Sequence, residues 1–225
     1  MLLDKIKKKE AKIGVVGLGY VGLPLVIEFC NSGFSVTGLD IDEKKIKALS
    51  QGKSFIKHIP DEKIQALNQD GKFEASNNFT LVEKLDCILI CVPTPLNKNR
   101  EPDMSYIVST AKQIAPHMKK GQLVILESTT YPGTTQEVLL PELEPGSGLK
   151  GNADFFVAYS PEREDPNNKD FTTSTIPKVI GSDHPTGLEL SQSLYSCIIN
   201  KTVPVSSTRV AEATKLMENI FRSVN

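Results

Sequence analysis

Three glycines near the N-terminus constrain the fold more strongly than any other feature of the sequence. They lie in the run Gly17, Leu18, Gly19, Tyr20, Val21 and Gly22. The run follows an apolar segment rich in β-branched residues, 12–17, which is typical of a strand. It opens the segment 20–31, whose apolar residues recur at helical spacing. In this context the pattern Gly-x-Gly-x-x-Gly predicts a strand, a tight turn and a helix that bind the pyrophosphate of a dinucleotide.

Each glycine has a separate predicted role. Gly17 allows the tight turn, Gly19 lets the pyrophosphate approach the backbone, and Gly22 lets the helix pack closely on the strand. The helix N-terminus offers free N–H groups and the positive end of its dipole to the phosphates. Tyr20 and Val21 lie between these glycines and complete the predicted cofactor-binding turn.

An acidic residue follows at the expected distance. Asp40 ends a second predicted strand, 35–40, and lies 18 residues after Gly22. A carboxylate there binds the 2′-hydroxyl of the adenosine ribose and repels a 2′-phosphate, so the sequence favours NAD over NADP. Lys44 and Lys45 weaken this preference, because a nearby cation accepts phosphate.

The rest of the chain alternates between strand-like and helix-like segments, which predicts an α/β, Rossmann-type, doubly wound parallel sheet. Further strands are expected at 73–76, 86–92, 122–127, 154–158, 178–180 and 202–205. Further helices are expected at 42–50, 61–69, 105–118, 134–140 and 186–196. Loops rich in proline, glycine and hydroxyl residues at 93–102, 128–133 and 160–168 follow three of the strands. They should therefore lie at the binding edge of the sheet.

The last segment differs from the rest. Residues 209–225 read as one helix with an apolar stripe, Val210, Ala213, Met217, Ile220, Phe221 and Val224. No glycine or proline ends this helix. We therefore expect residues 1–205 to form the NAD-binding domain and residues 206–225 to begin a long connecting helix of a truncated protein.

Composition excludes several classes of function. The formal net charge of −1 gives no general attraction to nucleic acid or anionic membranes. No apolar run approaches the ~20 residues that span a bilayer, and residues 1–12 lack the apolar stretch of a secretory signal. A cytoplasmic location is therefore expected. The four cysteines and three histidines show no metal-binding spacing, so no metal is expected.

Three loops carry a resemblance to a known family. They are Val92-Pro93-Thr94-Pro95, Glu127-Ser128-Thr129-Thr130-Tyr131-Pro132-Gly133-Thr134-Thr135 and Tyr159-Ser160-Pro161-Glu162-Arg163. Together with the glycine run they resemble the nucleotide-sugar 6-dehydrogenases from about Lys12 to Asn225. The Ser-Pro-Glu-Arg segment resembles the branch that acts on UDP-N-acetylglucosamine and UDP-N-acetylmannosamine. The UDP-glucose branch usually has an aromatic residue after the glutamate.

The resemblance implies an NAD⁺-dependent oxidation of the sugar C6 alcohol to a carboxylate, in the synthesis of polysaccharide precursors. It implies a homodimer or larger assembly of the full-length protein. It places Lys45 near the adenosine ribose. The implied cofactor neighbours are Pro93, Thr94, Ser128 and Thr129, the implied catalytic residues are Glu162, Lys215, Asn219 and Thr129, and the implied substrate contacts are Glu162, Arg163 and Lys215. Lys215 and Asn219 share a helix face opposite the apolar stripe, where the helix pattern alone favours a solvated surface.

Departures from the family keep other functions open. The family uses a cysteine nucleophile beyond the connecting helix, and none of the four cysteines here lies in such a motif. The chain is therefore expected to bind NAD⁺ without completing turnover. The alternatives are a UDP-glucose 6-dehydrogenase, a free-standing NAD-binding regulatory module and another dehydrogenase of the β-hydroxyacid type.

Overall fold

One twisted sheet forms the centre of the molecule. The computed structural model describes residues 1–96, 98, 101–162 and 176–224. Within these residues eight strands pair in the order β3-β2-β1-β4-β5-β6-β7-β8. The strands are β1 (Lys12–Val16), β2 (Ser35–Leu39), β3 (Phe73–Ser76), β4 (Cys87–Ile90), β5 (Leu123–Leu126), β6 (Phe156–Tyr159), β7 (Lys178–Gly181) and β8 (Thr202–Val205).

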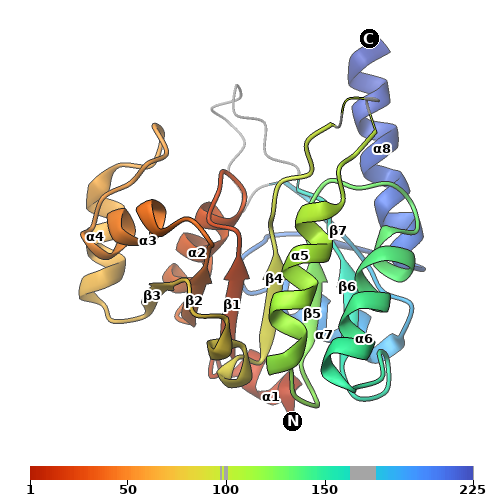
Figure 1. The fold of residues 1–225 in the computed structure, drawn as a ribbon, viewed down its shortest axis with the longest axis horizontal. Coiled ribbons are helices and arrows are strands. Elements are labelled where there is room, and N and C mark those ends of the chain that lie inside the picture. The colour runs from red at the N-terminus through yellow and green to blue at the C-terminus, as the bar shows by residue number, and fades with distance from the viewer. Residues whose placement is uncertain (97, 99–100, 163–175, 225) are drawn as a thin grey trace.

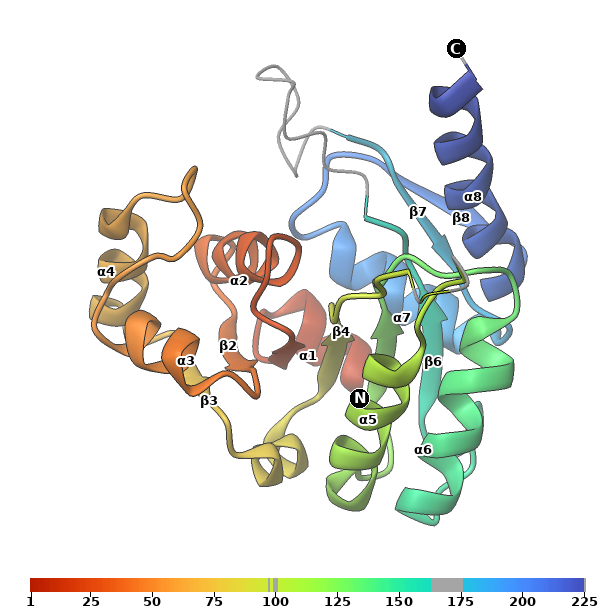
Figure 2. The same ribbon diagram turned by 45° about the horizontal axis from the view of Figure 1, so that its top comes forward.

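Helices cover both faces of this sheet (Figures 1 and 2). The core on one face receives buried side chains from α1 (Leu2–Lys7), α2 (Gly22–Asn31), α3 (Glu43–Ser50), α4 (Asp61–Gln69) and α7 (Pro185–Tyr195). The core on the other face receives buried side chains from α5 (Ser105–Ile114), α6 (Leu140–Ser147) and the start of α8 (Thr208–Val224). Shorter segments also contribute to it: the 3₁₀ helices η1 (Phe79–Lys84) and η2 (Ala115–His117) and the π-helical turn η3 (Thr135–Leu139). The predicted Rossmann-type α/β fold is confirmed.

The strand order reverses beside β1. The chain runs outward from β1 to β2 and β3, and then returns to place β4 on the other side of β1. In doubly wound sheets such a reversal opens a crevice at the carboxyl ends of the strands, where ligands bind.

One strand pair departs from the prediction of a parallel sheet. β6 and β7 are antiparallel and pair through Tyr159 and Gly181, whereas the other neighbours are parallel. No helix is described between β6 and β7, and a right-handed crossover of the kind that joins parallel strands usually needs one. As a consequence, the start of β7 lies near the carboxyl end of β6.

Helix ends also differ from prediction where the backbone cannot continue. The expected helix 20–31 begins at Gly22, because residues 17–21 form the glycine turn. The expected helix 105–118 ends at Ile114 and continues as η2, which contains Pro116, a residue without a backbone N–H. The short helix α1 was not predicted.

The apolar stripe of the last helix is mostly exposed in the described chain. Thr208, Ala211 and Glu212 are its buried residues, whereas the apolar stripe is largely exposed, with Met217 71% and Val224 79% accessible. Helical spacing identified which residues share a face, but no described element covers that face. The division of the chain at residue 205 coincides with the end of β8, and the assignment of 206–225 to a connecting helix stays a prediction.

Candidate functional site

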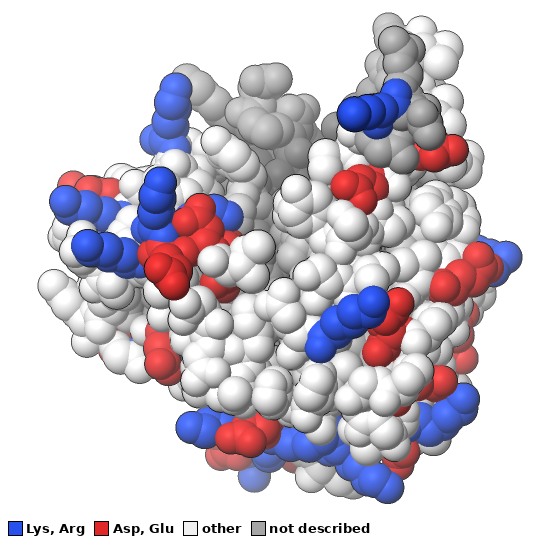
Figure 3. Space-filling view, viewed as in Figure 1, with Lys and Arg blue, Asp and Glu red and all other residues white. Residues whose placement is uncertain are grey.

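A cavity of about 510 Å³ lies at the carboxyl ends of β1, β2, β4 and β5. This volume is within the ~300–1,000 Å³ typical of ligand sites. Its wall consists of Val16, Gly17, Gly19, Tyr20, Val21, Leu39, Asp40, Ile41, Asp42, Lys45, Phe79, Cys91, Val92, Pro93, Thr94, Tyr106, Ser109, Thr110, Gln113, Glu127, Ser128, Thr129 and Glu162. The face in Figure 3 has a largely uncharged centre, around which side chains of both signs are mixed.

The glycine turn forms one wall because its backbone passes very close to neighbouring chain. Gly17 has a φ of +92°, and a Cβ on it would lie 2.8 Å from the carbonyl oxygen of Cys91. A Cβ on Gly22 would lie 1.9 Å from the carbonyl oxygen of Gly17. A Cβ on Gly19, by contrast, would meet nothing within 4 Å. Gly19 therefore faces open space in the wall of the cavity, which leaves room for a ligand to reach the backbone.

Asp40 connects the glycine turn to the end of β2. Its carboxylate is 5% exposed and accepts hydrogen bonds from the backbone N–H groups of Leu18 (2.8 Å) and Asp42 (2.9 Å). The ammonium of Lys45 donates to the same carboxylate at 2.9 Å. Asp40 therefore braces the turn, and Lys45 offsets part of its negative charge beside the cavity.

The opposite wall is formed by the loops after β4 and β5, which hydrogen bonds hold together. Thr94 donates its hydroxyl to the carbonyl of Thr129 at 2.6 Å. Ser128 donates to the carbonyl of Val92 at 2.6 Å, and the buried Tyr159 hydroxyl donates to the carbonyl of Ser128 at 3.1 Å. Burial raises the pKa of Tyr159, so it remains a donor. These bonds fix the hydroxyl side chains that line this end of the cavity.

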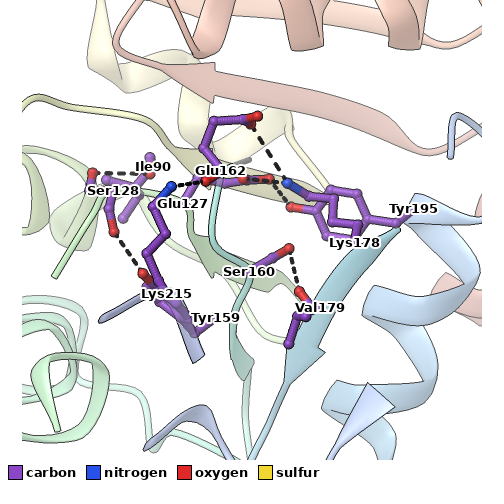
Figure 4. Close-up of polar contacts among 10 residues, drawn as sticks. All are labelled: Ile90, Glu127, Ser128, Tyr159, Ser160, Glu162, Lys178, Val179, Tyr195 and Lys215. Carbon is purple, nitrogen blue, oxygen red and sulfur yellow. Dashed lines mark hydrogen bonds and ion pairs between the residues drawn. The ribbon is translucent and has the colours of Figure 1, made fainter. Parts of the chain in front are cut away.

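Helix α8 reaches the same end of the cavity. The Lys215 ammonium donates to the backbone carbonyl of Glu162, whose side chain lines the cavity (Figure 4). One turn earlier, the buried Glu212 accepts from the backbone N–H of Gly133 at 2.5 Å and from the N–H and hydroxyl of Thr135 at 2.8 and 2.6 Å. Glu212 thus ties α8 to the segment that follows Thr129 in the chain.

Buried charges lie beneath Glu162 (Figure 4). The Lys178 ammonium, 6% exposed, donates to the fully buried Glu127 carboxylate at 2.8 Å and lies 3.8 Å from a carboxylate oxygen of Glu162. The Tyr195 hydroxyl of α7 donates to the other oxygen of Glu127. Burial alone would lower the pKa of Lys178, but Glu127 and Glu162 together raise it, so the ammonium stays charged.

The structure brings most of the predicted site residues together. All the predicted cofactor neighbours except Gly22 line the cavity, and Gly22 lies behind the turn. Thr129 and Glu162 also line it, and Lys215 touches Glu162. Asn219 is exposed one turn farther along α8 and is not part of the wall, and Arg163 lies outside the described residues. The roles of these residues as ligands or catalysts stay predictions.

Sequence reasoning missed one wall of the cavity. Tyr106, Ser109, Thr110 and Gln113 of α5 line it, together with Phe79. The four α5 residues have the spacing of a single helix face, and this polar stripe was the signal available in the sequence. Glu127 and Lys178 were missed as well, because each appeared as a single charge at the edge of an apolar strand.

Other chemistries find little support in the described part of the chain. The cysteines are free, and burial raises the pKa of Cys30 to about 12 and raises that of Cys91, which lines the cavity. A thiol with a raised pKa is a poor nucleophile. Among residues 1–96, 98, 101–162 and 176–224, no group of three or more metal-binding side chains occurs. In the same ranges no helix is long and apolar enough to cross a bilayer.

The cavity fits a dinucleotide. Gly19 leaves backbone N–H groups open at the start of α2, where a pyrophosphate would lie. Asp40 offers carboxylate oxygens on the β2 side, where an adenosine ribose would be held. The remaining space extends past β4 to Thr129 and Glu162, which gives the second half of the dinucleotide a place at the β5 side.

Comparisons with known proteins agree with this geometry. The description "UDP-glucose/GDP-mannose dehydrogenase family, NAD binding domain" matches residues 11–199. UDP-N-acetyl-D-glucosamine 6-dehydrogenase of Pseudomonas aeruginosa is 41% identical over 96% of this chain and 51% of its own length. The structure of UDP-D-ManNAc dehydrogenase from Pyrococcus horikoshii superposes with a TM-score of 0.88 at 35% identity, over 95% of this chain and 51% of that one. A ternary complex of GDP-mannose dehydrogenase from Pseudomonas aeruginosa gives 0.85 at 31% identity, over 94% and 50%.

This chain spans about half the length of those relatives. The matched region contains strands β1 to β7, the glycine turn and the residues that line the cavity described above. The chain therefore belongs to the UDP-glucose/GDP-mannose dehydrogenase family, of which it contains the NAD-binding domain.

Proposed function

We propose that this chain is the NAD-binding part of a UDP-N-acetylhexosamine 6-dehydrogenase. Such an enzyme oxidises the C6 alcohol of UDP-N-acetylglucosamine or UDP-N-acetylmannosamine to a carboxylate, with two molecules of NAD⁺. One observation carries the proposal: a single cavity joins a dinucleotide-binding turn to a carboxylate, Glu162, whose backbone is held by Lys215 from another element. The relatives named as UDP-N-acetyl-D-glucosamine and UDP-N-acetyl-D-mannosamine dehydrogenases support the N-acetylhexosamine branch.

The residues divide between binding and chemistry. The backbone around Gly19 would hold the pyrophosphate and Asp40 the adenosine ribose. When bound, NAD⁺ supplies the hydride acceptor of the reaction. Glu162, at the far end of the cavity, is a carboxylate suited to accept a proton from a sugar hydroxyl or a water molecule. The Lys215 ammonium and the Thr129 hydroxyl would stabilise negative charge that develops on the C6 oxygen.

The remainder of the reaction depends on chain outside these residues. We propose that the cysteine nucleophile and most of the UDP site belong to the other half of the enzyme. The high pKa of the buried Cys91 thiol supports this division, because Cys91 is the only cysteine in the described cavity wall. The 225-residue chain should then bind NAD⁺ and produce no uronate.

Binding and turnover test the two parts of the proposal separately. Calorimetric titration of the 225-residue chain should give a measurable affinity for NAD⁺ and a much weaker one for NADP⁺. The full open reading frame should release NADH with a UDP-N-acetylhexosamine. Turnover of UDP-glucose alone would instead identify a UDP-glucose 6-dehydrogenase. NAD⁺ binding without turnover of any sugar nucleotide would favour a regulatory module.

A further inference from the structure

The residues Glu127, Lys178 and Glu162 form a cluster of charges, and we refer to them as the inner charge cluster. No step proposed above uses Glu127 or Lys178. Glu127 ends β5, Lys178 begins β7 and Glu162 follows β6. Lys178 lies 2.8 Å from one carboxylate and 3.8 Å from the other, and both carboxylates line the cavity. Two negative charges therefore share one buried positive charge at the cavity wall.

The antiparallel direction of β7 creates this arrangement. Tyr159 pairs with Gly181, so the start of β7 runs past the end of β6 and brings Lys178 level with Glu162. The Ser160 hydroxyl donates to the carbonyl of Val179 at 2.8 Å and fixes that register. A parallel β7 would have placed its first residue at the opposite edge of the sheet.

The described groups beside Glu127 and Lys178, other than Glu162, carry no charge. The Tyr195 hydroxyl contacts Glu127 and Cys91 lies nearby, and burial raises the pKa of both, so both are neutral. The Lys215 ammonium is only half-buried and lies on the α8 side of Glu162. Burial raises the pKa of Glu127 and the adjacent Lys178 ammonium opposes that rise, so the ion pair favours the charged carboxylate. Where Glu127 is ionised, removing either Glu127 or Lys178 changes the charge at the inner wall by one unit, in opposite directions.

A dinucleotide spans the cavity from Asp40, on the β2 side, to Thr129, on the β5 side. With the adenosine ribose at Asp40, the nicotinamide half lies toward β5, next to the inner charge cluster. The nicotinamide ring is cationic in NAD⁺ and neutral in NADH. Charges in a poorly solvated wall act on that difference more strongly than charges in water do.

We propose that Lys178, held between Glu127 and Glu162, sets how strongly this cavity prefers NAD⁺ over NADH. The two carboxylates favour the cationic ring and the ammonium offsets them. The inference rests on the proposed position of NAD in the cavity and concerns the cofactor equilibrium of this domain alone. At an effective dielectric of ~20, a unit charge would change the ratio about tenfold if it lay ~12 Å from the ring, and by more if it lay closer.

The test is the ratio of the NADH and NAD⁺ dissociation constants, measured by NADH fluorescence and by calorimetry on the 225-residue chain. At a pH high enough to keep Glu127 ionised without its partner, Lys178→Met should raise this ratio about tenfold, and Glu127→Gln should lower it by a similar factor. The double variant Lys178→Met/Glu127→Gln removes both charges and should return the ratio to the wild-type value. Lys178→Arg should also keep that value.

Lys120→Met is the matched control, because Lys120 pairs with Asp154 on the exposed amino edge of the sheet. It should leave the ratio unchanged. Far-UV circular dichroism identifies any variant that does not fold. If Glu127→Gln does not fold, Glu162→Gln replaces it and should also lower the ratio. If Lys178→Met does not fold, the double variant compared with Glu127→Gln shows the effect of removing Lys178 and should have the higher ratio. Equal ratios in folded single variants, or shifts of the same sign, would overturn the proposal. If the wild type binds neither form, the proposed function fails instead.

Discussion

Two glycine substitutions separate ligand binding from folding in the turn at residues 17–22. A Cβ on Gly19 meets nothing within 4 Å and would project from the wall of the cavity. Gly19→Ala should therefore change the free energy of unfolding by less than ~1 kcal/mol, partly because alanine restricts the unfolded chain. The added methyl occupies the approach of the pyrophosphate, so NAD⁺ affinity should fall at least ~10-fold, which is ~1.4 kcal/mol.

Gly22→Ala is the matched variant that should affect folding. Its Cβ would lie 1.9 Å from the carbonyl oxygen of Gly17 and 3.2 Å from a methyl of Val15, so α2 must move away from β1. Overpacking of this kind costs ~1–3 kcal/mol, and a backbone neighbour places this variant at the upper end. Urea denaturation gives the stability of both variants and calorimetry gives their NAD⁺ affinity. If Gly19→Ala binds NAD⁺ as tightly as the wild type, the pyrophosphate does not lie on this turn.

Four further predictions follow from single residues. Asp40→Asn should weaken NAD⁺ binding and bring the calorimetric affinities for NAD⁺ and NADP⁺ closer together, because the charge that repels a 2′-phosphate is lost. An unchanged ratio of the two affinities would contradict that role. Glu212→Ala leaves buried donors without an acceptor and should cost ~2–4 kcal/mol in urea denaturation, whereas the exposed Glu189→Ala should cost less than ~0.5 kcal/mol. Burial also raises the pKa of Glu212 above its ordinary value of 4.5, so the folded chain binds that proton more tightly than the unfolded chain. Wild-type stability should thus fall as the pH rises through this raised value, and Glu212→Ala should show a smaller fall. Iodoacetamide should modify the half-buried Cys197 before the buried cysteines, and mass spectrometry of the labelled protein measures this order. Rapid labelling of Cys91 in the folded protein would contradict its burial.

The part of the site that the sequence predicted is local in the chain. The glycine turn requires specific backbone positions within six residues, and Asp40 follows one helix and one strand later. This spacing in the sequence predicts the position of Asp40 beside the turn, because both belong to a single βαβ unit. The same holds for the helices α3 and α4, whose predicted bounds match the structure closely.

The part that was missed depends on contacts between distant segments. Lys178 reaches Glu127 only because β7 runs antiparallel to β6, and no residue of the strand itself encodes its direction. The surroundings of the apolar stripe of α8 could not be predicted for a related reason. Periodicity identifies the apolar face of a helix, but whether that face is buried depends on which other segments pack against it. Residues such as Met217 are exposed in the described chain although their spacing is that of a buried face.

The attachment of α8 through Glu212 has a mechanical consequence. Because one carboxylate grips the backbone at both Gly133 and Thr135, the first turns of this helix move as one body with the loop that carries Thr129. If further chain follows this domain, as proposed above, bending between the two would occur after Glu212, and the pivot would lie at or beyond the turn that carries Lys215. Rotation about such a pivot would change the distance between the Lys215 ammonium and Glu162 and would leave the cavity wall around Thr129 unchanged.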